Sequence, residues 1–219
     1  MKITITHYRS VARLGIAVCA LLLPTTSQAA LLNLNLAITP DIVSGFMDVS
    51  YDAATDSFSA TGFALELKVD GAGVEPIADG SFLLDATIAG TGALTTGTVT
   101  IGGTIAGLGF NSGTLLTGML TAFSFPAGGG NPLEFTFDIT GGDAAAGYGP
   151  NAGIIMADTG FTGGFNTDFD NLVSGLPGTG SGFADTAPMV TPVPAALWLF
   201  GSGLFALAGI TRRRHVIRA

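Results

Sequence analysis

The fold class is decided by Gly45-Phe-Met-Asp-Val-Ser-Tyr51, the turn Asp52-Ala-Ala-Thr-Asp56, and Ser57-Phe-Ser-Ala-Thr-Gly-Phe63. In both outer stretches, apolar residues alternate with small or polar ones, which is the two-residue period of a β-strand with one buried face. The turn between them holds two aspartates, a residue type that is favoured in turns. This pattern predicts a β-hairpin over residues 45–63.

The same alternation continues on both sides of the hairpin. Further strands are predicted for residues 32–36, 64–69, 81–89, 93–101, 115–125 and 133–140. Turn signals such as Asp70-Gly71 and Gly141-Gly142 separate several of them. No segment of this region has the 3.6-residue period of an amphipathic helix. The sequence therefore predicts an all-β domain over residues 30–173, an antiparallel β-sandwich or barrel, with a short β-helix as the alternative.

The N-terminal residues have the layout of a secretory signal peptide. Lys2, Arg9 and Arg13 precede an apolar stretch at residues 14–23, and Ser27-Gln28-Ala29-Ala30 follows it. A basic start, a short apolar core and a small-x-small site are the three parts of such a signal. We expect a signal helix within residues 1–29, with cleavage between Ala29 and Ala30. Export is the predicted consequence.

The C-terminal residues have the layout of a membrane anchor. Residues 193–211 are 19 residues without a charge, which as a helix span roughly 28 Å, close to the thickness of the hydrocarbon core. Trp198 lies near the start of this run, and Arg212, Arg213 and Arg214 follow it. Because arginines favour the cytoplasmic side, a single-pass helix over residues 193–211 is predicted. Residues 174–191, rich in Gly, Pro and Thr, are predicted to be a flexible linker before it.

The tail resembles the C-terminal sorting signal of bacterial PEP-CTERM proteins. Pro192, Val193 and Pro194 occupy the place of the Pro-Glu-Pro of that signal, and the stretch from Val193 to Gly203 resembles its Val-Pro-Leu-Pro-Ala variant. Glu is missing between the prolines. The resemblance covers residues 192–219 and implies recognition by an exosortase, a membrane-embedded protease. It also implies cleavage near residues 192–194, location at the cell surface or outside the cell, and association with exopolysaccharide in Gram-negative bacteria.

Charge divides the chain in the same way. All 16 acidic residues lie between Asp41 and Asp185, where Lys68 is the one basic residue. Such a surface repels nucleic acid and anionic lipid headgroups, so nucleic acid is excluded as a partner. Divalent cations, neutral glycans and cationic surfaces remain possible partners. The simpler interpretation, that repulsion keeps the domain soluble, is equally open.

Missing residue types limit the possible chemistry. Residues 30–190 contain no His, Cys, Arg or Trp. Serine–histidine and cysteine–histidine catalysis, and zinc sites built on His or Cys, are therefore excluded from this region. A pair of carboxylates could still serve a glycosidase, but such sites usually add aromatic platforms for sugars, and the region has no Trp and only Tyr51 and Tyr148. We expect a protein without enzymatic activity.

Asn166, Asp168 and Asp170 form the densest polar cluster. Oxygen ligands at alternating positions can converge on calcium. The same spacing also fits an edge strand whose polar face is solvated and whose other face carries Phe165, Thr167 and Phe169. The main hypothesis is a non-enzymatic exported surface or matrix protein. The alternatives are a calcium-assisted module that binds glycans and, third, an acid/base glycosidase.

Overall fold

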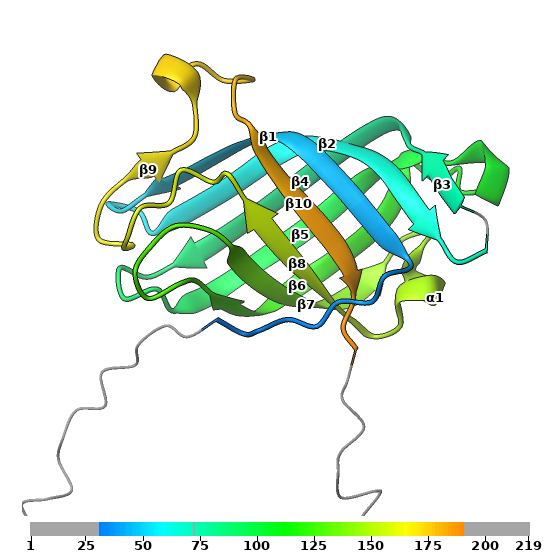
Figure 1. The fold of residues 1–219 in the computed structure, drawn as a ribbon, viewed down its shortest axis with the longest axis horizontal. Helices are drawn as coiled ribbons and strands as arrows, with labels where there is room; N and C mark the ends of the chain where they lie inside the picture. The colour runs from blue at the N-terminus through cyan, green and yellow to red at the C-terminus, as the bar shows by residue number, and fades with distance from the viewer. Residues whose placement is uncertain (1–30, 72, 191–219) are drawn as a thin grey trace, which may run out of the picture.

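The computed structural model describes residues 31–71 and 73–190, and within them the chain is all-β with almost no helix (Figure 1). Eight antiparallel strands form a closed barrel, because β1 pairs with β2 on one side and with β10 on the other. The barrel strands are β1 (Asp41–Asp52), β2 (Ser57–Val69), β4 (Ala78–Ile88), β5 (Leu94–Thr104), β6 (Thr114–Ser124), β7 (Leu133–Gly141), β8 (Asn151–Ala157) and β10 (Gly182–Pro188). The remaining elements are β3 (Gly73–Pro76), β9 (Phe169–Asp170), α1 (Ala145–Tyr148) and two short 3₁₀ helices, Ala106–Leu108 and Val173–Gly175.

Alternation along each strand places one set of side chains inside the barrel. In β4, Phe82, Leu84, Ala86 and Ile88 are buried, whereas the residues between them are exposed or half-buried. The two-residue period of a strand sends successive side chains to opposite faces. The inner face is therefore apolar, and the outer face meets solvent.

Large side chains fill the inside of the barrel. Phe58, Phe82, Phe135 and Phe137 are fully buried, and they come from β2, β4 and β7. An eight-stranded barrel is just wide enough for side chains to fill it. Gly118 leaves room for these rings, because a Cβ atom there would lie 2.2 Å from Cδ2 of Phe137.

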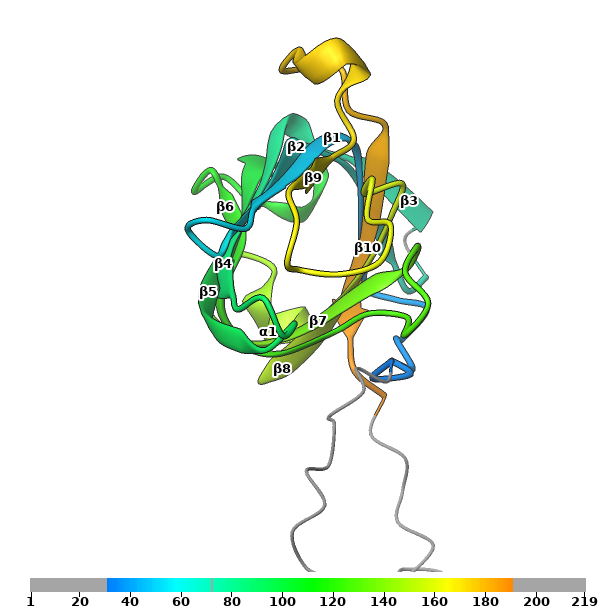
Figure 2. The same ribbon diagram turned by 90° about the vertical axis from the view of Figure 1, so that its left-hand side faces the viewer.

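An aromatic plug, defined as residues 158–171, crosses one mouth of the barrel between β8 and β10 (Figure 2). Phe161 and Phe165 stack with ring centroids 5.1 Å apart, and Tyr51 of β1 meets the Phe165 ring edge-on at 4.8 Å. Phe125, just after β6, packs against Phe161 at 5.2 Å. Burial of these rings closes this end of the core.

At the other end, α1 follows β7 and lies opposite β9 (Figure 1). The turn before α1 is tied to β6, since the backbone N–H of Ala144 donates to the carbonyl of Leu115 at 3.0 Å. Ala144 and Tyr148 are buried against the core. Both ends of the barrel are thus covered by the segments that connect its strands.

A bulge interrupts β1. The register shifts between Ser44 and Met47 against β10, and between Gly45 and Asp48 against β2. Phe46, within the bulge, has a positive φ of 53°. A bulge adds a residue and redirects a side chain. Phe46 consequently points out of the barrel and is 70% exposed.

The first residues of the described chain cover part of the outer face. The backbone N–H of Leu32 donates to Ser124 Oγ at 2.9 Å, and that of Asn33 donates to Glu134 Oε2 at 3.0 Å. Further on, Leu36 forms an antiparallel bridge with Met189, beyond the end of β10. Residues 35–37 and 188–190 therefore lie side by side.

The predicted sandwich or barrel is a barrel, and its antiparallel pairing rules out the β-helix alternative. The prediction of a linker over residues 174–191 is wrong for residues 182–188, which form β10 between β8 and β1. Asn151–Ala157, which was not predicted, forms β8. The predicted signal helix and the predicted membrane helix at residues 193–211 lie outside the described residues. No helix within the described ranges has the length and hydropathy of a membrane span.

Candidate functional site

The residues predicted to bind calcium lie in the aromatic plug. Asp168 Oδ1 accepts a hydrogen bond from the backbone N–H of Ala53 at 2.8 Å, and Asp170 Oδ1 accepts one from that of Leu172 at 2.9 Å. Asn166, Asp168 and Asp170 are all exposed. Across residues 31–71 and 73–190, no group of three His, Cys, Asp or Glu residues is placed to hold a metal ion. Calcium binding stays a prediction.

The alternative prediction, an edge strand, is correct only for the last two residues of the segment. Of residues 166–170, only Phe169 and Asp170 form a strand, β9, which pairs with Ser50 and Tyr51 of β1. Phe165 is buried and Phe169 half-buried, while Asn166, Asp168 and Asp170 face solvent. The predicted division into two sides therefore holds for the two phenylalanines and the polar residues. It fails at Thr167, which is exposed, and most of the segment is not a strand.

Asn171 connects the plug to β1, a role that the sequence analysis missed. Its Oδ1 accepts from the backbone N–H of Val49 at 2.9 Å, and its Nδ2 donates to the carbonyls of Met47 and Asp158 at 2.9 and 2.7 Å. The Asn171 side chain thus pairs with β1 just past the bulge, as a neighbouring strand would. Only its position beside a Gly-rich loop could have hinted at this role.

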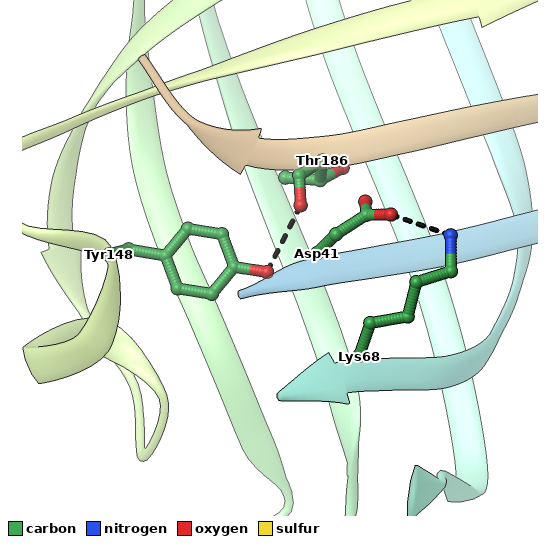
Figure 3. A network of polar contacts seen from close by, with 4 residues as sticks. All are labelled: Asp41, Lys68, Tyr148 and Thr186. Carbon is green, nitrogen blue, oxygen red and sulfur yellow. Dashed lines mark hydrogen bonds and ion pairs between the residues drawn. The ribbon is translucent and has the colours of Figure 1, made fainter. Parts of the chain in front are cut away.

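A polar network lies where β1, β2 and β10 meet (Figure 3). Lys68 Nζ donates to Asp41 Oδ2 at 2.8 Å, and this hydrogen bond raises the pKa of Lys68 despite partial burial. Partial burial and the neighbouring charge of Asp41 raise the pKa of Asp185. An amine that acts as a base needs a lowered pKa. Lys68 is instead held as a cation within this network.

Tyr148 of α1 completes the network from inside the barrel (Figure 3). Its hydroxyl donates to the backbone carbonyl of Thr186 at 3.0 Å. Burial, followed by the nearby charge of Asp41, raises the pKa of Tyr148 well above its usual value. The Tyr148 hydroxyl therefore stays protonated and links α1 to β10. The network joins structural elements, and this role needs no ligand.

One shallow groove on the outer face of β2, β4 and β5 is polar. Its volume is about 350 Å³. It is lined by Ser57, Asp85, Ala86, Thr87, Thr96, Gly97 and Thr98. Ser59 donates to Asp85 Oδ1 at 3.0 Å and orients that carboxylate. Hydroxyl and carboxylate groups in one groove offer donors and acceptors of the kind that bind sugar hydroxyls.

A second groove, called the apolar groove below, lies beside the bulge of β1 and has a volume of about 540 Å³. It is lined by Phe46, Phe63, Ala64, Leu65, Ile77, Asp79 and Gly80. Phe63 is 57% exposed on β2, opposite Gly45 of β1. Phe183 of β10 is exposed as well.

The residues of the predicted sorting signal (Pro192, Val193, Pro194, Trp198, Arg212, Arg213 and Arg214) and of the predicted signal cleavage site (Ala29 and Ala30) lie outside the described residues. What the structure shows is where their neighbours lie. The backbone N–H of Ala37 donates to the carbonyl of Pro188, and that of Val190 donates to the carbonyl of Asn35, both at 2.8 Å. The C-terminal segment therefore begins beside Asn35, four residues after the first described residue, Leu31.

Comparison of this chain with protein-family models, curated proteins and solved structures gives no match.

Proposed function

We propose that this is an exported, non-enzymatic protein of the cell surface or extracellular matrix, with a barrel sorted by an exosortase-type tail. The observation that carries this proposal is the sequence of residues 192–214, a Pro-Val-Pro site, an uncharged run and three arginines. An exosortase-type membrane protease would recognise that tail. Before processing, the protein would be a single-pass membrane protein, and exopolysaccharide is its expected surrounding.

The shape of the barrel agrees with this proposal. Leu36 and Met189 are bridged, so the chain enters and leaves the barrel at one place. The C-terminal tail alone could therefore attach the barrel to the membrane or the cell surface. Pro192 lies only two residues after Val190, whose backbone N–H is bonded to Asn35. A sorting protease would therefore work close to the folded barrel.

Intact-mass analysis of the cell-associated and released protein tests this proposal. We expect the chain to begin at Ala30 and to end near Pro192 after processing. A matched variant, Arg212→Ala with Arg213→Ala and Arg214→Ala, should retain the tail through Ala219. A cytoplasmic product that keeps residues 1–29 would contradict the proposal. A surface product that ends at Ala219 would contradict removal of the tail and leave a simple anchor.

The polar groove favours glycan binding as a second function. Thr96 and Thr98 of β5 face outward beside Asp85. Isothermal titration of the barrel with the exopolysaccharide of the producing cell checks this function. Thr96→Val with Thr98→Val should weaken binding, whereas Thr162→Val, at an exposed position of the aromatic plug, should not. Equal binding by both variants would remove the groove from consideration.

A further inference from the structure

The apolar groove leaves aromatic surface in water. Phe46 and Phe63, which line it, are 70% and 57% exposed, and Leu65 beside them is 40% exposed. With about 200 Å² for each ring-bearing side chain, the two phenylalanines alone leave roughly 250 Å² of exposed aromatic surface. Contiguous apolar patches of a few hundred Å² on a soluble protein commonly mark a binding site. A standard interface buries about 800 Å² on each partner, so this patch could form its apolar centre.

The charges around the groove indicate what kind of partner fits. Asp79 lines the groove, and Glu66 follows Leu65, another lining residue, on β2. Lys68 is the single basic residue of the described chain, and it is already paired with Asp41. A second copy of the barrel would bring the same carboxylates against these and be repelled. An apolar segment that ends in cations complements the groove.

The chain itself contains such a segment. Residues 193–211 are uncharged and largely apolar, and Arg212, Arg213 and Arg214 follow them. The segment begins just after β10, the strand that carries Phe183. Phe63 of the groove pairs with Gly45 of β1, at the level of Phe183 on β10. It therefore lies about 23 Å from Val190 along the strands and two strand spacings, about 10 Å, across the sheet. Residues 191–198 span about 26 Å when extended, which is long enough to bring Trp198 to the groove.

We propose that the apolar groove binds residues 193–211 of the same chain when no bilayer holds them. The inference rests on the proposed function, in which this segment is the membrane-directed tail. The groove has a volume of about 540 Å³ and can cover only one side of a helix. A bilayer surrounds the whole segment and buries more apolar surface. The segment consequently leaves the groove for lipid, and the groove shields it only beforehand.

Trp198 allows a direct test, because it is the only tryptophan of the chain and lies in the proposed bound segment. The protein from Ala30 to Ala219 is measured without detergent by fluorescence and acrylamide quenching. We expect a blue-shifted, weakly quenched Trp198 that is independent of protein concentration. Phe63→Ser should shift the emission to longer wavelengths and increase quenching. Phe46→Ser is the second variant if Phe63→Ser unfolds, and circular dichroism checks the fold of both.

Met119→Ser is the matched control, because Met119 is 54% exposed on β6, away from the groove. This variant should leave the Trp198 emission unchanged. When phosphatidylcholine vesicles are added, Phe63→Ser should partition into them more strongly than the unsubstituted protein, because the competing groove is lost. Both results would support the proposal.

Three outcomes would overturn the proposal. Emission of Trp198 that is the same with and without Phe63→Ser would mean that the groove does not hold the segment. Dimers of residues 31–190 that dissociate on Phe63→Ser would make a second copy the occupant. Binding of residues 31–190 to the vesicles would make lipid the occupant. None of these outcomes alters the mass of the exported protein, so failure here is distinguishable from failure of the proposed function.

Discussion

At the scale of single residues, Asn171 joins three segments that are far apart in the sequence. Its side chain bonds Met47, Val49 and Asp158, and its backbone N–H donates to the carbonyl of Val49 at 3.2 Å. β1 continues past its last pair with β10, Met47 with Gly182, so its next backbone groups need another partner. A side-chain amide can serve there because it carries both a donor and an acceptor.

Asn171→Ala should lower the free energy of unfolding by about 2 kcal/mol, because it leaves backbone groups of β1 without partners. Urea denaturation followed by circular dichroism measures the change. Asn166→Ala is the control, since Asn166 is exposed in the same plug, and this substitution should have little effect. Equal midpoints for both variants would show that Asn171 does not support β1.

Tyrosine ionisation provides a second prediction at this scale. Burial, with the charge of Asp56 next, raises the pKa of Tyr51 to about 12, and burial also raises that of Tyr148. Unfolded tyrosine ionises near pH 10. Because the unfolded chain loses these protons first, the stability that they contribute is complete below about pH 10 and falls as pH rises toward 12.

A titration of tyrosinate absorbance checks this expectation on the protein from Ala30, which retains only Tyr51 and Tyr148. The folded protein should show no tyrosinate near pH 10, and absorbance should rise only as the chain unfolds at higher pH. The same chain in urea should titrate near pH 10. A folded protein that titrates there would contradict the burial of both hydroxyls.

At the scale of elements, β10 closes the barrel. Phe183–Pro188 pair with β8, and residues of the same strand pair with β1. A chain that ends at Val173, where the sequence analysis placed the end of the domain, lacks this strand. It should expose two unpaired strand edges and aggregate.

Size-exclusion chromatography and urea denaturation compare chains from Ala30 that end at Val173 and at Val190. The longer chain should be soluble and unfold cooperatively. A soluble shorter chain with the same transition would contradict the closure by β10. This comparison also shows where the folded unit ends.

The sequence predicts the strands that alternate and misses those that do not. Residues 45–63 combine alternation with a turn, and they form the predicted hairpin. Asn151–Ala157 gives no alternating signal because residues 31–36 cover the outer face there, and a Cβ atom on Gly153 would lie 2.6 Å from Leu36 Cδ2. Gly182–Pro188 is hidden by its Gly, Thr and Pro content, which is also typical of a linker.

The sequence predicted the candidate sites less completely than it predicted the strands. Phe46, Phe63 and Phe183 are far apart in the sequence, and only the closure of the barrel brings their strands together. The outward direction of Phe46 depends on a bulge that no local pattern indicates. Composition did predict the acidic surface, because the excess of acidic over basic residues is the same however the strands are arranged.

At the scale of the whole molecule, residues 31–190 carry 16 carboxylates and only one basic side chain, Lys68. Like charges destabilise a compact state, and salt screens them. Raising NaCl from about 0.01 M to about 1 M shortens the Debye length from about 30 Å to about 3 Å. The melting temperature of the barrel should rise over this range, as measured by calorimetry.

The same measurement separates screening from a calcium site. Calcium and magnesium at equal concentration should raise the melting temperature equally if only screening acts. A larger rise with calcium that Asp168→Asn removes would support the predicted ligands Asn166, Asp168 and Asp170. A melting temperature that is independent of salt would contradict the role of repulsion.

The bridge between Leu36 and Met189 also determines how the protein bears force. From this antiparallel pair, the chain before Leu36 and the chain after Met189 run in the same direction. Tension between them therefore breaks the backbone hydrogen bonds at Asn35 and Pro188 one after another and not all at once. Such loading needs little force per bond. When the barrel is pulled between its own ends, β10 should therefore detach early, and the barrel should unfold at low force.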